Sequence, residues 1–357
     1  MTHEKALAPG TVIQGEKRSY RVVDVLRVDG LGFAYKAVTE VRRGSRIIEA
    51  PTVVREHMMI RCSDRGPDGV TVVTPEDIAP TVDSCLEVFI QSSLERARIS
   101  AECPWIINVL ETFRSNNTYY YAVEFLDGDT LEDYVMKMGG SLTFEQARKV
   151  LAPIFDAVRT LHANKAVHTD ITPWHIRFVH RGDELIPVLF SLYASMHFND
   201  KGTQQWSIPV MTCEEGYAPP EQYTSIEHFC PQMDIYSLAA TLVYALSGRN
   251  LPDSRGLSED VVRETLPPTV PENIVSAILN SLNSDPAVRT STVTKFREDL
   301  GTFQGESANE TSRSILDDDG NSTDDGYTLL SYMRENWLRL LIPLVMLGVL
   351  VALVASM

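Results

Sequence analysis

Six short motifs in a fixed order constrain the fold of this chain more than its composition does. The most informative is His168-Thr169-Asp170-Ile171-Thr172-Pro173-Trp174-His175, which is followed sixteen residues later by Ser191-Leu192-Tyr193. The others lie on either side of it: Thr52–Met58, Gly216–Tyr223, Met233–Leu238, Ala245–Arg249 and Asp285–Arg289. Any one of them is a weak signal, but together, in this order and at these intervals, they predict one fold.

The apolar periodicity divides the chain into a strand-rich first part and a larger helical part. Residues from about 20 to 54 alternate as three strands, and residues 106–125 alternate as two more. Residues 86–101 have helical spacing, as does most of the chain after Leu131, where Thr143 is a candidate N-cap. A small strand-rich half followed by a helical half is an α+β pattern.

The motifs resemble those of protein kinases, most closely the bacterial members of the eukaryotic-type serine/threonine family. Residues 168–175 are similar to the catalytic loop H-R-D-[LI]-x-P-x-N, and Ser191-Leu192-Tyr193 stands where that family has D-F-G. Gly216–Tyr223 is similar to G-Y-A-P-x-E-Q-Y. The resemblance covers about residues 20–303 and implies a bilobal, protein-kinase-like fold with a small β-rich N-lobe and a large helical C-lobe.

The resemblance and the composition together give an expected domain organisation. In order, we expect a polar tail (1–17, without the apolar core of a signal peptide), a kinase-like domain (18–304, with the N-lobe at about 18–125 and the C-lobe at about 126–304), an acidic flexible linker (305–336) and a transmembrane helix (337–357).

Several residues carry structural roles that the resemblance implies. Glu221 and Arg289 correspond to a buried ion pair of the helical lobe, and Asp234 to a carboxylate that braces the catalytic loop. Glu124 to Leu126 correspond to the hinge between the lobes, after Val123 at the gatekeeper position. If a nucleotide binds, the implied contact positions are Gly30, Gly32, Val53, Arg55, Glu95, Glu124 and Leu126.

The positions that perform phosphoryl transfer are only partly retained. Asp170 stands where the catalytic base belongs, preceded by His168, but it could also be retained only to brace the loop, which is the reading we favour. Arg55 replaces the lysine of the third strand, and either Glu95 or Arg96 stands where its helix partner belongs. In the phosphate-covering turn two glycines are replaced, by Arg27 and by Asp29, and the charge of Asp29 would repel phosphate.

The two metal positions have lost their usual ligands. Magnesium prefers carboxylate, carbonyl and water oxygens, whereas this chain offers His175 and Ser191. His175 with Asp170 nearby could hold a softer metal such as manganese or zinc, but a single histidine is more often packed or hydrogen-bonded. We therefore expect no metal site, and ATP with magnesium or manganese only if the chain is an active enzyme.

The net charge limits the possible partners of the chain, and the cysteines indicate the compartment in which it works. A net charge of −16 argues against nucleic acid as a partner and against adsorption to anionic lipid. Five scattered cysteines without a C-x-x-C pair indicate free thiols in a reducing compartment. They are Cys62, Cys85, Cys103, Cys213 and Cys230.

The C-terminal segment predicts a membrane anchor. Leu340 to Met357 is uncharged, and at helical rise it would span roughly 27 Å, close to the apolar thickness of a bilayer. Arg334 and Arg339 favour a cytoplasmic location for the kinase-like domain, with the C-terminus at the far side. A hydrophobic packing or oligomerisation tail is the alternative.

Three functions compete on this evidence. The first is a membrane-anchored pseudokinase, a scaffolding or regulatory module for protein partners that the sequence does not identify. The second is a divergent serine/threonine protein kinase that transfers the γ-phosphate of ATP to protein hydroxyls. The third, for which no residue speaks directly, is a transferase of another kind on the same fold.

Overall fold

The computed structural model describes residues 3–192, 195–199, 213–224 and 228–301. The chain divides into two units, one comprising residues 1–177 and 187–303 and the other comprising residues 178–186 and 304–357. Of the second unit, only 178–186 is among the described residues, where it forms most of the hairpin of β10 (Ile176–Arg181) and β11 (Glu184–Leu189). The candidate site lies in the first unit.

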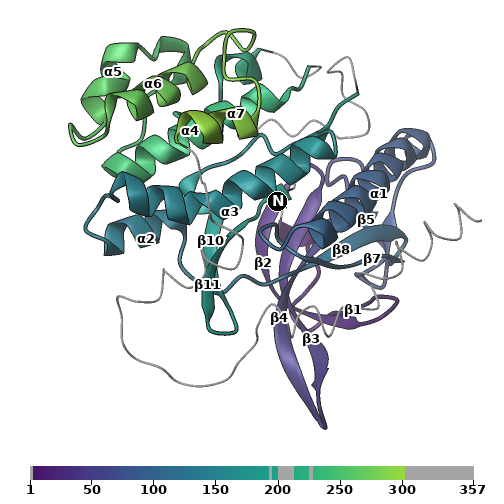
Figure 1. The fold of residues 1–357 in the computed structure, drawn as a ribbon. Helices are drawn as coiled ribbons and strands as arrows, with labels where there is room; N and C mark the ends of the chain where they lie inside the picture. Colours follow the sequence, from purple (N-terminus) through teal and green to yellow (C-terminus); the bar gives the residue numbers. More distant parts are fainter. Residues whose placement is uncertain (1–2, 193–194, 200–212, 225–227, 302–357) are drawn as a thin grey trace, which may run out of the picture. The chain divides into compact units, whose positions relative to one another are not determined.

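An antiparallel sheet of six strands forms the N-terminal part of the first unit, in the order β1-β2-β3-β4-β8-β7 (Figure 1). The five predicted strands are present, and β1 is added at the edge. Their bounds are β1 Val12–Gln14, β2 Ser19–Asp29, β3 Gly32–Arg43, β4 Arg46–His57, β7 Val109–Ser115 and β8 Thr118–Glu124.

The turn between β2 and β3 needs glycine for a steric reason. Gly32 has a φ of 139°, and a Cβ there would lie 2.2 Å from the carbonyl oxygen of Glu56 on β4. The register pairs Asp29 with Gly32 and Ala34 with Arg55. The β2–β3 turn is therefore held tightly against the end of β4, which brings Asp29 close to Arg55.

The helix α1 (Ala79–Glu102) contacts β7 and β8 of this sheet. It confirms the predicted helix at 86–101 but begins seven residues earlier, with a proline in its first turn, a position that proline favours. Phe89 and Ile99 are buried along its inner face, and Phe89 packs against the rings of Tyr119 and Tyr121 on β8.

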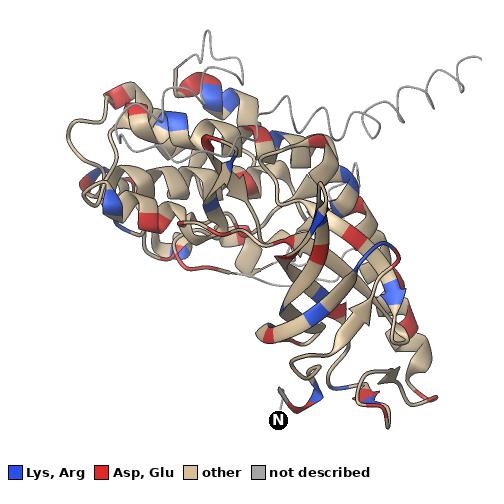
Figure 2. Ribbon diagram, turned by 90° about the horizontal axis from the view of Figure 1, so that it is seen from below, with Lys and Arg blue, Asp and Glu red and all other residues tan. Residues whose placement is uncertain are grey.

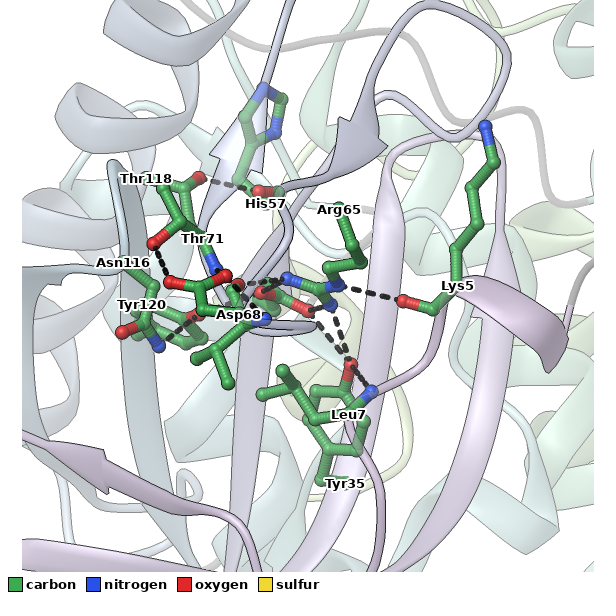
Figure 3. Close-up of polar contacts among 12 residues, drawn as sticks. Lys5, Leu7, Tyr35, His57, Arg65, Asp68, Thr71, Asn116, Thr118 and Tyr120 are labelled. Atoms are coloured by element: carbon green, nitrogen blue, oxygen red, sulfur yellow. Dashed lines mark hydrogen bonds and ion pairs between the residues drawn. The ribbon is translucent and has the colours of Figure 1, made fainter.

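Residues 58–78 carry two short strands, β5 (Asp64–Arg65) and β6 (Val72–Val73), and bring a charged side chain into the sheet's other face. Arg65 forms a salt bridge at 2.6 Å with Glu56, which is fully buried on β4. The hydroxyls of Tyr35 and Tyr120 donate to the same carboxylate at 2.7 and 2.6 Å. Figure 3 shows Arg65 reaching Tyr35 and the carbonyl of Lys5 at the centre of this network.

The C-terminal part of the first unit is mainly helical, as predicted. Its α-helices are α2 Leu131–Lys137, α3 Phe144–Ala163, α4 Pro231–Ser247, α5 Glu259–Thr265, α6 Glu272–Ser281 and α7 Val293–Asp299. The expected N-cap of α3 is confirmed, since Thr143 and Gln146 form a reciprocal capping box. Short strands β9 (Ala166–Val167) and β12 (Met196–His197) pair with each other and were not predicted, because two residues show no alternation.

Short 3₁₀ helices complete the described elements. They are η1 His3–Lys5, η2 Pro173–His175, η4 Pro220–Tyr223 and η5 Ser254–Gly256. All five cysteines are free. The expected linker and transmembrane helix lie outside the described residues, and within the part that is described no helix combines the length and apolarity that crossing a membrane requires.

Candidate functional site

The loop at residues 168–175 is fixed by one buried carboxylate. Asp234, in the first turn of α4, accepts hydrogen bonds from the backbone N–H groups of His168 and Thr169, both at 2.8 Å. Its Oδ2 also lies 2.8 Å from Nε2 of His162, at the end of α3. Because Asp234 is fully buried, these contacts hold the loop to both helices.

Two residues of the site have a left-handed backbone that non-glycine residues seldom adopt. Thr169 has a φ of 64°, and Ser191, in the place of the D-F-G aspartate, has a φ of 69°. Thr169 is restrained from both sides, since its N–H donates to Asp234 and its carbonyl accepts from Gln222 Nε2 at 2.8 Å. The backbone frame of the site is therefore maintained at an energetic cost.

Asp170 lies between two histidines whose tautomers follow from their contacts. The N–H of Asp170 donates to Nδ1 of His168 at 3.2 Å, so Nε2 of His168 carries the proton directed at the Phe190 carbonyl, 2.8 Å away. Burial lowers the pKa of His168, which agrees with a neutral ring. Nδ1 of His175 lies 2.9 Å from the carbonyl oxygen and 3.3 Å from Oδ2 of Asp170. That nitrogen is thus occupied by oxygens of the loop itself.

Arg55 pairs with a carboxylate from the β2–β3 turn. One terminal nitrogen of its guanidinium lies 2.6 and 2.7 Å from the two oxygens of Asp29. Oδ1 of Asp29 also accepts the N–H of Leu31 at 2.9 Å, which orients the carboxylate. Gly30, at the tip of the same turn, has open space around it. The negative charge at this turn belongs to its neighbour Asp29.

Neither α1 candidate pairs with Arg55. Glu95 lies on the outer side and binds Arg98 at 2.8 Å. Arg96 is buried, and its Nε donates to the Leu192 carbonyl at 2.8 Å. Burial lowers the pKa of Arg96, and the charge of Arg55 acts in the same direction. The helix therefore contacts the segment that follows Ser191, while the partner of Arg55 comes from the turn.

The hinge region is contacted by a cation that sequence reasoning missed. Arg177, at the start of β10, donates to the Leu126 carbonyl at 3.3 Å, and its guanidinium lies 5.4 Å from the centre of the Phe190 ring. Glu124 is bound back to Asn108, whose N–H donates to its Oε1 at 2.9 Å. The available signal was a single arginine within the otherwise apolar run Ile176–Val179.

The remaining predicted residues take structural positions. Glu221 and Arg289 form a salt bridge at 2.7 Å, with Arg289 fully buried and stacked on the ring of Tyr236. Val53 lies opposite Val123 in the β4–β8 register. The described residues contain no group of three or more His, Cys, Asp or Glu side chains that could bind a metal ion.

Comparison with known proteins identifies relatives of this chain. The family model of the protein kinase domain matches residues 92–298. Serine/threonine-protein kinase PrkC of Bacillus subtilis is 26% identical over 62% of this chain and 34% of its own length. Serine/threonine-protein kinase PknA of a Nostoc species is 31% identical over 38% of this chain and 24% of its own length. The chain thus spans about a third or less of these two relatives.

Solved structures show the same fold. PpkA-294 in its apo form has a TM-score of 0.58 at 22% identity, covering 83% of this chain and 99% of that one. The PknI kinase domain of Mycobacterium tuberculosis has a TM-score of 0.53 at 16% identity, covering 83% and 98%. At such identities the likeness concerns the fold alone.

Proposed function

This chain belongs to the protein kinase domain family, and on that premise we propose that it is a pseudokinase, a regulatory or scaffolding module that binds protein partners without transferring phosphate. The salt bridge between Arg55 and Asp29 carries this proposal. It places a carboxylate against the cation that, in the family pattern, receives a phosphate.

The salt bridge opposes nucleotide binding electrostatically. A phosphate that approached Arg55 would have to displace Asp29 or remain beside it, because both carboxylate oxygens already lie within 2.7 Å of the guanidinium. Two unit charges of the same sign at about 4 Å repel by about 4 kcal/mol at an effective dielectric constant of 20. A repulsion of that size would lower affinity roughly a thousandfold.

The metal positions support the same proposal. Ser191 offers a neutral hydroxyl, and Nδ1 of His175 is directed at Asp170. Magnesium requires several oxygen ligands, usually with at least one carboxylate from the protein beside the phosphates. The residues at these two positions do not fit a magnesium–nucleotide complex, and we assign no catalytic step that depends on one.

Arg177 adds an obstacle at the hinge position. Its side chain connects the hinge carbonyl of Leu126 to the ring of Phe190 beside the catalytic loop. A planar base that entered between hinge and loop would have to compete with this guanidinium. The geometry thus argues against nucleotide at the base end and at the phosphate end.

The alternative is a divergent active kinase, and one observation favours it. Asp170 and the left-handed backbone at Thr169 and Ser191 keep the frame of a catalytic site, braced by Asp234. An enzyme that used another route to hold the phosphates would need this frame. A scaffolding protein would not, unless the loop stabilises the helical lobe.

We further propose that residues 337–357 anchor the protein in a membrane as a single-pass helix, with the kinase-like domain on the cytoplasmic side. The support is the uncharged run that follows Arg339 and the length of that run. Protein partners near the membrane would then be the natural class, since the net charge of −16 disfavours nucleic acid.

The test is phosphate transfer by the full-length protein in detergent, measured with γ-labelled ATP and either magnesium or manganese. We expect neither autophosphorylation nor transfer to a generic protein substrate. The triple variant Asp29→Gly, His175→Asn, Ser191→Asp restores the family residues and should gain ATP-dependent thermal stabilisation. Label transfer by the wild type that disappears in Asp170→Asn would establish the active kinase and overturn the proposal.

A further inference from the structure

A cavity lies at the start of α1, away from the phosphate and metal positions. It has a volume of about 470 Å³, within the range of small-molecule sites. Three segments enclose it: the first turns of α1, residues 57–74 from the last residue of β4 onward, and the β7–β8 turn. We call it the α1 pocket; its apolar wall includes Met58, Met59, Val72, Val82 and Leu86.

His57 borders the α1 pocket with unused hydrogen-bonding capacity. The residue is 2% exposed, and neither ring nitrogen has a hydrogen-bond partner among the residues that the structure describes. Its ring centre lies 4.9 Å from that of Phe89 on α1. Figure 3 shows the ring pointing away from Arg65 and Tyr35. Those two side chains contact Glu56, the residue before His57 on β4, and successive residues of a strand face opposite sides.

The other polar groups around the pocket are largely engaged within the protein. The hydroxyl of Thr118 donates to the carbonyl of His57, and the hydroxyls of Ser63 and Thr74 lie 2.9 Å apart. The Nδ2 groups of Asn116 and Asn117 donate to the Tyr120 hydroxyl and the Val72 carbonyl. Of the side chains that border the pocket, His57 is therefore the one that would gain most from a polar ligand.

The charged side chains around the pocket balance each other, so the lining favours neither a cation nor an anion. Arg114 and Asp83, both exposed, contribute one positive and one negative side chain to its lining. Burial lowers the pKa of His57 to about 4, with Arg55 acting in the same direction and Asp29 opposing it. At neutral pH the ring is uncharged, so that one nitrogen donates a hydrogen bond and the other accepts one.

We propose that the α1 pocket binds a small uncharged molecule that has an apolar body and a neighbouring hydrogen-bond donor and acceptor. The apolar body would pack against Met58, Val82 and Leu86. The ring nitrogens of His57 are buried, so the ring would turn toward the pocket for its nitrogens to meet the donor and acceptor of the ligand. An aromatic primary carboxamide has this chemistry. The inference does not rest on the pseudokinase proposal, since no residue of the pocket belongs to the phosphate or metal positions.

The test uses four probes of similar size: benzamide, benzoate, benzylammonium and ethylbenzene. Binding to the full-length protein in detergent is followed by ligand-observed NMR, and the ring nitrogens of ¹⁵N-labelled histidines report on His57. We expect benzamide to bind most tightly and to shift the His57 signals. The variant His57→Phe should weaken benzamide by about two- to tenfold, the effect of one hydrogen bond, while leaving ethylbenzene unchanged.

A matched pair of variants on one helix locates the binding site. Leu86→Trp fills the pocket and should abolish benzamide binding, whereas Leu94→Trp, at an exposed position two turns further along α1, should leave it intact. Leu86→Trp also decides the matter if His57→Phe does not fold. The proposal is wrong if benzamide does not bind, if benzoate or ethylbenzene binds as tightly, or if binding survives Leu86→Trp.

Discussion

Replacing Asp29 by Asn should reveal how strongly the β2–β3 turn is tied to β4. The side chain of Arg55 is 7% exposed and that of Asp29 is 21% exposed, so the pair is mostly withdrawn from water. Removing one partner of a fully buried pair costs about 3–5 kcal/mol, and partial exposure of Asp29 reduces this to about 2 kcal/mol. Asparagine can still accept the N–H of Leu31, which isolates the effect of the charge.

The measurement is a double-mutant cycle on the full-length protein by urea and thermal unfolding, with Asp29→Asn, Arg55→Met and the double variant. A loss of about 2 kcal/mol corresponds to a fall in Tm of roughly 4–8 °C for a domain somewhat smaller than this one. The double variant should lose much less than the sum of the single variants. Asp24→Asn, an exposed carboxylate on the same strand, is the control and should lie within about 0.5 kcal/mol of wild type.

The same variant separates stability from anion binding. With Asp29 neutralised, Arg55 has a free charge, so tripolyphosphate should raise the Tm of Asp29→Asn more than that of the wild type. A coupling energy below about 0.5 kcal/mol would show that the pair is energetically irrelevant. The electrostatic argument for a closed phosphate position would then be refuted, whatever the activity assay gives.

Three further outcomes follow from individual contacts. Burial lowers the pKa of His57 from 6.5 to about 4, so the unfolded chain takes up the proton at a higher pH than the folded chain. The free energy of unfolding should therefore fall by roughly 2 kcal/mol between pH 7 and pH 5. His57→Phe should reduce this pH dependence, measured by urea titrations. Glu221→Gln should destabilise the protein by about 2–3 kcal/mol, because it leaves the fully buried Arg289 without its carboxylate. The control Glu259→Gln removes an exposed partner of Arg263 and should cost less than about 1 kcal/mol in the same unfolding assay. Lys165→Gly should stabilise by about 0.5–1 kcal/mol in thermal unfolding, since Lys165 follows α3 with a φ of 52°; a loss of stability would show that its side chain matters more than its backbone.

Much of the fold could be predicted from the sequence because it depends on local periodicity. The strands around residues 20–54 and 106–125 and the cap at Thr143 follow from alternation and from one side-chain oxygen. The short strands β9 and β12 could not be predicted, because they exist only through their pairing with each other. The ordered motifs supplied the rest of the architecture.

The site was harder to predict because its contacts depend on register. Asp29 meets Arg55 across 26 residues, and only the pairing of β2, β3 and β4 brings them together. The sequence named Glu95 as the candidate partner of Arg55, with Arg96 as the alternative from the motif alignment, and the phase of the helix places Arg96 inside. The role of Arg177 needed the hinge carbonyl in three dimensions.

The left-handed backbone at Ser191 has a consequence for evolution. The change at Ser191 would be easier to reverse than the change at Asp29 and Arg55. Aspartate tolerates this conformation, so a carboxylate could return at that position by a single substitution without moving the main chain. Asp29 and Arg55 are interdependent, since a change at Asp29 leaves the buried Arg55 without its carboxylate, and a change at Arg55 leaves Asp29 with only the more distant Arg27, 3.7 Å away. A lineage could thus recover the carboxylate at position 191 in one step, whereas reopening the phosphate position would have to pass through a less stable intermediate.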